Sequence, residues 1–161
     1  MLTRGKQAEQ GFTIIEVLIV LGIAGLIFSI IFMALPTLSR SSRNNQRRQD
    51  IALLLQEVAH FELNNSGAFP SAADPTDAAF FTNIKLNYYD TNTTPINFAS
   101  GTTGTTPAET DPEHVSIYNR KLCKTDGSGT ADDLNAGLRD IVAIYAIESS
   151  PSVITSQCMQ L

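Results

Sequence analysis

The longest apolar run of the chain extends from Gly11 to Leu35 and contains one charged residue, Glu16. A helix rises about 1.5 Å per residue, so this run is about 36 Å long and can cross a hydrocarbon core of about 30 Å. Its apolar side chains favour membrane insertion by roughly 5 to 10 kcal/mol, and one acidic group opposes insertion by at most about 3 kcal/mol. Residues 12–36 are therefore predicted to form a membrane-spanning helix.

Three residues are expected to disturb this helix. Gly22 and Gly25 lie in mid-span, where glycine often marks close contact between helices. Pro36 lacks a backbone donor and disfavours helical backbone at Leu35, so a kink or a loosened turn is predicted there.

The periodicity changes after Pro36 to that of an amphipathic helix, predicted over residues 37–66. Its apolar stripe consists of Ile51, Leu54, Leu55, Val58 and Phe61. The stripe is interpreted as the face that packs on a C-terminal sheet, with a partner-binding groove as the alternative. Stop signals follow at Asn64–Gly67, and Pro70 prevents the helix from resuming.

The remaining chain divides into a connection and a strand region. Residues 67–112 are rich in Thr, Pro, Ala, Asn and Gly and are predicted to form a surface connection with room for a short strand or helical turn. Alternating or continuous apolar runs at 114–118, 140–147 and 152–159 predict short antiparallel strands. The fold class is therefore α+β, a long N-terminal helix packed on a small C-terminal antiparallel sheet over residues 113–161.

Composition excludes several classes of function. The formal net charge is −5, which favours solubility of the body and argues against general nucleic-acid binding. His60, His114, Cys123 and Cys158 show no close metal-ligand spacing, and no glycine-rich phosphate loop is present. We therefore expect no enzyme activity, no catalytic residue, no cofactor and no specific nucleic-acid partner.

Four basic residues, Arg40, Arg43, Arg47 and Arg48, follow the apolar run. They are interpreted as a solvated band that faces anionic lipid headgroups, with a DNA-capturing patch as the alternative. Their charge opposes the positive-inside expectation for a cytoplasmic amino end.

One stretch has weak calcium character. Oxygen side chains fall at positions one, three, five and seven of a candidate ligand loop, at Asp126, Ser128, Thr130 and Asp132, and Asp133 follows. Ala131 and Gly137 stand where a calcium-binding loop needs glycine and a bidentate acid. A solvated hairpin loop is the favoured interpretation.

The start of the apolar run, Gly11-Phe12-Thr13-Ile14-Ile15-Glu16 behind a short basic leader, resembles the processing site of type IV pilins and their relatives. In that family a membrane peptidase cuts after the glycine and methylates the new amino group. The resemblance implies a leader over residues 1–11, cleavage between Gly11 and Phe12, and N-methylation of Phe12. It also implies that Glu16 guides assembly, because a buried carboxylate becomes tolerable beside the cut amino end of a neighbouring subunit. The alternative is that Glu16 snorkels to the interface.

The resemblance also implies the pilin fold and a structural role in a pilus-like filament that serves adhesion, motility or DNA uptake. The implied partners are copies of the chain, a prepilin peptidase, an inner-membrane assembly platform and, before assembly, the lipid bilayer. The amino end would be cytoplasmic and the C-terminal domain outside. Minor or competence pilins and type II secretion pseudopilins remain alternatives, as does a singly anchored extracellular binding domain.

On the exported side, Cys123 and Cys158 most simply form one disulfide, which is also frequent at the C-terminus of pilins. Two free buried thiols are the alternative.

Overall fold

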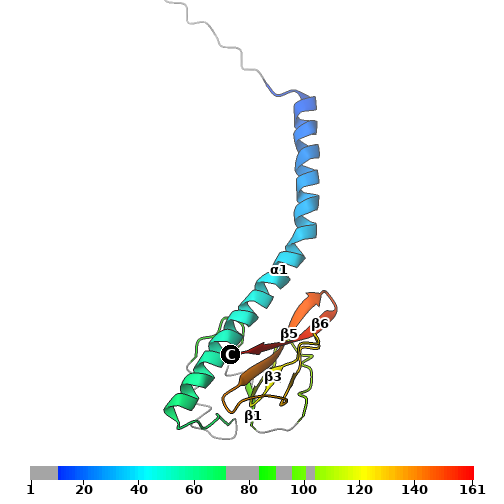
Figure 1. Cartoon of the computed structure of the whole chain (residues 1–161). Helices are drawn as coiled ribbons and strands as arrows, with labels where there is room; N and C mark the ends of the chain where they lie inside the picture. The colour runs from blue at the N-terminus through cyan, green and yellow to red at the C-terminus, as the bar shows by residue number, and fades with distance from the viewer. Residues whose placement is uncertain (1–10, 72–83, 90–95, 101–103) are drawn as a thin grey trace, which may run out of the picture. The chain divides into compact units, whose positions relative to one another are not determined.

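The computed structural model describes residues 11–71, 84–89, 96–100 and 104–161, and these contain one helix and six strands. The elements are α1 (Ile14–Asn64), β1 (Ile96–Ala99), β2 (Val115–Asn119), β3 (Leu122–Cys123), β4 (Ala131–Asp132), β5 (Ile141–Ser150) and β6 (Val153–Gln160), as Figure 1 shows. The chain divides between Ser39 and Arg40 into two compact units. We call them the apolar unit, described from Gly11 to Ser39, and the sheet unit, Arg40–Leu161.

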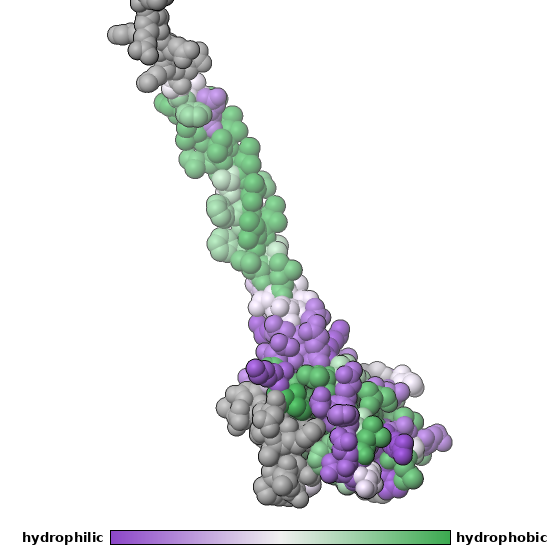
Figure 2. Space-filling model, turned by 90° about the vertical axis from the view of Figure 1, so that its left-hand side faces the viewer, coloured by the Kyte–Doolittle hydropathy of each residue, from purple (hydrophilic) through white to green (hydrophobic). Residues whose placement is uncertain are grey.

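The apolar unit has no core of its own. All its large apolar side chains are exposed, from 45% at Ile31 to 88% at Phe12, and Figure 2 shows a continuous hydrophobic surface on the face of the helix turned to the viewer. Helix α1 is long and apolar enough in this part to cross a membrane, by length and composition. An apolar surface of this extent requires a cover of lipid or protein, so the predicted apolar helix is confirmed.

The helix passes through Pro36 without a break. The helix assignment is therefore continuous at this residue, and the predicted kink or loosened turn stays a prediction. Pro36 removes one hydrogen-bond donor, but the helix-forming residues on both sides keep the backbone helical around that defect. The backbone is also helical at Gly22 and Gly25, and a kink at the three residues stays a prediction.

The sheet unit contains a four-stranded sheet in the order β1-β2-β5-β6 and a separate two-stranded sheet of β3 and β4. Strands β2, β5 and β6 pair antiparallel, which confirms the three predicted strands and the α+β class. Strand β5 is central and fully buried over Ile141–Ala146, as its continuous apolar run predicts.

Helix α1 packs its apolar stripe on this sheet. Ile51, Leu54, Leu55 and Val58 are at most 1% exposed and share one core cluster with sheet residues such as Val115. The interpretation of the stripe as a sheet-packing face is confirmed. A smaller cluster on the opposite face of the sheet contains Val142 and Ile144.

The helix ends where the stop signals predict. Its last residue is Asn64, and Ser66 and Gly67 follow with φ of 58° and 82°. The Gly67 N–H donates to the Glu62 carbonyl over 2.7 Å. This bond satisfies one of the carbonyls that every helix C-terminus leaves open, and glycine adopts the left-handed conformation without steric cost.

Residues 67–112 contribute more than a surface connection. Ile96–Ala99 forms edge strand β1, which pairs with β2 in parallel and so departs from a purely antiparallel sheet. Ile96 is 8% exposed, and the Phe98 ring packs edge-to-face on Phe69 with centroids 6.1 Å apart. Two apolar side chains on the buried face are enough to hold this short strand.

The predicted disulfide is confirmed. Cys123 of β3 and Cys158 of β6 are bonded, with Cα atoms 5.6 Å apart. The disulfide links the small β3–β4 sheet to β6, the edge strand of the main sheet. The two cysteines are 35 positions apart in the sequence.

Candidate functional site

The residues of the predicted processing site precede the first turn of α1. Gly11 and Phe12 are not helical, and the Phe12 residue is 88% exposed. A Cβ placed on Gly11 would meet no atom within 4 Å. Both residues of the peptide bond to be cut are therefore exposed in the described part of the chain.

Thr13 and Glu16 form a reciprocal cap at the start of the helix. The Glu16 carboxylate accepts the Thr13 backbone N–H over 3.0 Å and the Thr13 hydroxyl over 2.8 Å. In return, the Glu16 backbone N–H donates to the Thr13 hydroxyl oxygen over 3.4 Å. This is the arrangement of a capping box, in which two of the open N–H groups of the first turn find partners.

The cap gives Glu16 a position that the sequence analysis missed. Thr13 was treated there as part of the processing motif alone, although the spacing Thr13-x-x-Glu16 before an apolar run is the sequence signature of a capping box. The Glu16 carboxylate points back along its own helix to Thr13, the residue that follows Phe12. Hydrogen bonds of this kind reduce the cost of placing a carboxylate in apolar surroundings.

Gly22 and Gly25 lie one turn apart on the apolar unit. A Cβ added to either would meet no atom within 4 Å. The described subunit therefore makes no close contact at these glycines, and their predicted role in contacts between helices stays a prediction.

The arginine cluster is only in part the solvated band that the sequence predicts. Arg47 is 1% exposed, and its guanidinium group contacts the carboxylate of Glu148 at 2.9 Å. Arg43 contacts the same carboxylate at 2.5 Å. These two arginines join the helix to the end of β5, so part of the cluster is structural, whereas Arg48 is exposed.

Asn44 completes this junction by acting on the backbone of β5. Strand β2 pairs with β5 up to Tyr145, which leaves the next part of that β5 edge without a β2 partner. The Asn44 side chain donates to the Glu148 carbonyl over 2.8 Å and accepts the Glu148 N–H over 3.0 Å. Both backbone groups of Glu148 are thereby satisfied by one side chain.

A second polar junction holds the segment 84–89 on the helix. The buried carboxylate of Asp50 accepts the backbone N–H groups of Asn87, Tyr88 and Tyr89 and the Asn87 side-chain amide, over 2.6–3.2 Å. Tyr88 also accepts a hydrogen bond from Arg47, whose guanidinium carbon lies 4.1 Å from the ring centroid.

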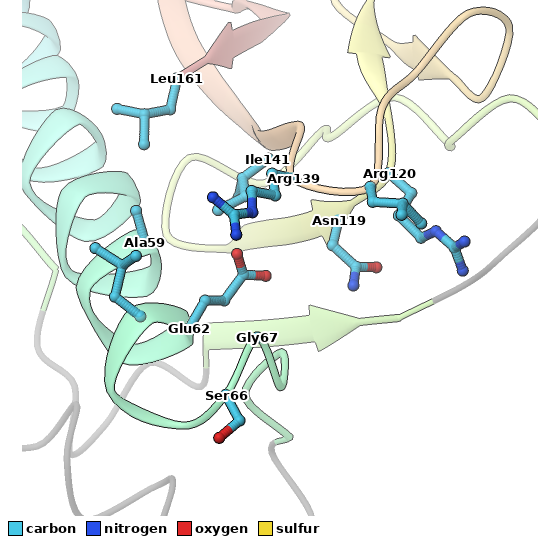
Figure 3. A pocket seen from close by; sticks show the side chains of 11 residues that line it. Ala59, Glu62, Ser66, Gly67, Asn119, Arg120, Arg139, Ile141 and Leu161 are labelled. Atoms are coloured by element: carbon cyan, nitrogen blue, oxygen red, sulfur yellow. The ribbon is translucent and has the colours of Figure 1, made fainter.

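A pocket of about 600 Å³ opens at the C-terminal end of the helix, between Glu62, Arg139 and the chain end at Leu161. Figure 3 shows the Glu62 and Arg139 side chains pointing toward one another. Partial burial raises the pKa of Glu62, and the charge of Arg139 opposes that rise.

The candidate catalytic groups are not assembled into a catalytic site. Both cysteines are consumed by the disulfide, which excludes a thiol nucleophile. His114 contacts Asp111 at 2.7 Å on the surface, and His60 is exposed on the helix.

The weak calcium candidate gains no support from the geometry. Asp126, Asp132 and Asp133 each accept a backbone N–H, from Ser128, Leu134 and Gly104 respectively. In the described part of the chain, no group of three or more His, Cys, Asp or Glu residues is placed to hold a metal ion. The Asp126 and Asp132 carboxylates serve their own turns, and Asp133 bonds the distant Gly104. The solvated hairpin loop stays the prediction, with calcium as its weak alternative.

Comparison with known protein families identifies a match at the N-terminal end of the chain. The family described as the prokaryotic N-terminal methylation motif matches residues 6–32. No curated protein and no solved structure matches the chain. The matched residues contain the exposed Gly11–Phe12 bond, the cap of Thr13 and Glu16, and most of the exposed apolar helix. The chain therefore carries a prepilin-type N-terminal methylation motif at the start of its long apolar helix.

Proposed function

We propose that the chain is a structural subunit of a type IV pilus-like filament. A prepilin peptidase cuts between Gly11 and Phe12 and methylates the new amino group of Phe12. The subunit waits in the cytoplasmic membrane with its sheet unit outside and then enters a helical filament that carries the apolar helices at its centre.

One observation supports this proposal more than the others: the methylation motif is followed directly by an apolar helix whose large side chains are all at least 45% exposed. A lipid bilayer covers such a helix before assembly, and copies of the same helix can cover it afterwards. The sheet unit has its own core and does not need the apolar unit to bury its stripe.

Glu16 is proposed to select correctly processed subunits. The Glu16 carboxylate already accepts two hydrogen bonds from Thr13. Cleavage would create a positively charged amine on Phe12, the residue before Thr13. An amine from a neighbouring copy can then compensate the carboxylate charge inside the filament, where an unpaired charge is strongly unfavourable.

The decisive experiment is mass spectrometry of filaments sheared from cells. The expected chain begins at Phe12 and carries one methyl group. Glu16→Ala is expected to leave insertion and cleavage intact and to abolish filaments, whereas Glu113→Ala, an exposed carboxylate of the sheet unit, should assemble normally. Recovery of a chain that begins at Met1, or normal filaments from the Glu16→Ala variant, would contradict the proposal.

A singly anchored binding domain is the competing function, because the same apolar helix would anchor it. It predicts that the chain is recovered from membranes as a monomer and is missing from sheared material.

A further inference from the structure

Three exposed leucines line the pocket at the C-terminal end of the helix, which we call the leucine-rimmed pocket. Leu63 is 72%, Leu138 74% and Leu161 58% exposed. Leu63 belongs to α1, Leu138 to the connection from β4 to β5, and Leu161 follows β6. Apolar side chains gathered at one hollow of a surface are typical of a site that a partner covers.

The leucine-rimmed pocket is also basic. Arg120 and Arg139 line it together with one acid, Glu62. Figure 3 shows Glu62 and Arg139 directed toward one another and Arg120 directed away from both. Neither arginine forms an ion pair with another residue that the structure describes. Two positive groups against one negative group favour a partner that brings carboxylates.

A fourth exposed leucine lies elsewhere on the same sheet unit. Leu134 is 71% exposed and directly follows Asp132 and Asp133 in the connection from β4 to β5. We call residues 132–135 the Leu134 loop. Leu134 does not line the leucine-rimmed pocket, but a separate hollow that it shares with Asp132 and Asn135. One copy of the chain therefore leaves its pocket open to the Leu134 loop of another copy.

Hydrogen bonds hold the Leu134 loop in shape. The Asp132 carboxylate accepts the Leu134 N–H over 3.2 Å, and the Asp133 carboxylate accepts the Gly104 N–H over 3.2 Å. The Asp133 carbonyl accepts the Ala136 N–H over 3.3 Å. A loop that is already ordered loses little conformational entropy when it binds, which favours association.

The Leu134 loop and the leucine-rimmed pocket have complementary charges. The two loop carboxylates and that of Asp126 outnumber the nearby cations of Lys121 and Lys124. On the pocket, the arginines outnumber the single glutamate. An exposed leucine with acidic neighbours on one copy thus matches a leucine rim with basic neighbours on another.

We propose that the Leu134 loop of one copy of the chain docks in the leucine-rimmed pocket of the next copy in the filament. Leu134 contacts the rim leucines, and the loop carboxylates lie against Arg120 and Arg139. The inference rests on the proposed filament function and deepens it by assigning a contact between sheet units. The contact is heterologous, because its two sides consist of different residues, and its repetition produces an open helical assembly.

The small size of this contact fits a partner that is already close. Stable protein interfaces bury about 800 Å² on each partner, which is more than one short loop covers. Two free sheet units would therefore not stay together through this contact alone. Copies that are joined through their apolar helices meet at a high effective concentration, at which a weak contact becomes occupied.

Photo-cross-linking in assembled filaments tests the proposal. A full-length variant with p-benzoylphenylalanine in place of Leu134 is co-expressed with the wild-type chain, so that wild-type copies supply intact pockets. Sheared filaments are irradiated and separated on a denaturing gel, and the cross-linked peptides are identified by mass spectrometry. The matched control carries the same group in place of Glu113, an exposed residue of the sheet unit.

The group at position 134 should link to peptides of another copy that contain Leu63, Leu138 or Leu161, and the group at position 113 should not. Bands of three and more linked copies are expected when the photoreactive chain is in excess. Links within one copy alone, links to other peptides, or bands that stop at two copies would overturn the proposal. If wild-type cells yield no filaments, the proposed function itself fails.

Substitution of Leu134 provides a second readout. Leu134→Ala should release about fivefold more subunit from sheared filaments at a fixed concentration of mild detergent. Leu134→Met keeps an apolar side chain of similar size, and Val153→Ala shortens another half-exposed aliphatic side chain; both should release as much as wild type. The melting temperature of the dispersed subunit should stay unchanged in all three variants. Equal release from Leu134→Ala and Val153→Ala would overturn the proposal.

Discussion

The guanidinium group of Arg47 lies 2.9 Å from the carboxylate of Glu148, although 101 positions separate the two residues. Arg47 is 1% exposed, and its contacts include the Asn44 side chain at 2.9 Å and the Tyr88 hydroxyl. One arginine thus joins the helix, the end of β5 and the segment 84–89. Because its charge is buried, its stabilising effect depends on all these partners together.

The first prediction concerns this ion pair. Glu148→Ala should lower the free energy of unfolding by about 3 kcal/mol, because it leaves the buried charge of Arg47 without its carboxylate. Urea unfolding of the oxidised full chain in detergent measures the loss. Glu113→Ala, an exposed carboxylate, is the control and should change the value by less than about 0.5 kcal/mol.

The same pair predicts a dependence of stability on pH. Hydrogen bonds from Arg43, assisted by Arg47, lower the pKa of Glu148 from 4.5 to about 2. Since the folded pKa is below the unfolded value, the pair stabilises the fold fully above pH about 4.5 and loses this effect as the pH falls toward 2. Wild type should lose more stability over that interval than Glu148→Ala, and parallel profiles would contradict the assignment.

The second prediction concerns Asp50, whose carboxylate faces four N–H donors. Asp50→Asn replaces an acceptor oxygen with a donor group and should reduce stability by about 2 kcal/mol. It should also increase amide exchange at Asn87, Tyr88 and Tyr89. Substitution of the exposed neighbour Gln49 by Ala should leave these amides protected, and unchanged exchange in Asp50→Asn would show that other contacts hold the segment.

The third prediction tests the cap at the start of the apolar helix. Thr13→Ala removes the hydroxyl that bonds to the carboxylate and backbone of Glu16 and should destabilise the first turn by about 1 kcal/mol. A loss of about 1 kcal/mol should raise the amide exchange rates of Glu16 and Val17 in detergent micelles about fivefold. Thr13→Ser preserves the hydroxyl and should exchange like wild type; identical behaviour of the Ala and Ser variants would argue against the capping box.

The fourth prediction compares two glycines of the β3–β4 loop. Gly127 and Gly129 both have positive φ, 77° and 66°. A Cβ on Gly129 would lie 2.1 Å from the Ser156 carbonyl oxygen, whereas one on Gly127 would meet no atom within 4 Å. Gly127→Ala should therefore cost about 1 kcal/mol from backbone strain alone, and Gly129→Ala clearly more, because β6 must shift. Thermal unfolding of both variants measures the difference, and equal costs would show that the loop can move away from β6.

Several features were predictable because their information is local. The apolar run, the helix stop at Asn64–Gly67 and the strand of residues 140–147 are defined by neighbouring residues and by periodicity. The capping box was also readable from its spacing but was missed, because the same residues belong to the processing motif. The pairing of Cys123 with Cys158 followed from their number and their expected location.

Other features depend on residues that meet only after the chain has folded. The arginine cluster reads as a solvated band, because nothing near Arg47 in the sequence indicates that Glu148 and Tyr88 will cover it. The same holds for Asp50, whose backbone partners lie 37 to 39 positions later. Strand β1 was hidden in a polar connection, since one buried side chain, Ile96, and one half-buried side chain, Phe98, are too few for a periodic signal.

The sequence by itself determined that a prepilin-type methylation motif opens an apolar helix, and that an amphipathic helix covers a small sheet, because periodicity and motif spacing act within a few residues. The tertiary structure decided which charges are buried and which edge of β5 Asn44 closes. Those outcomes depend on contacts between distant segments, and burial changes the energy of a charge far more than any local pattern can indicate.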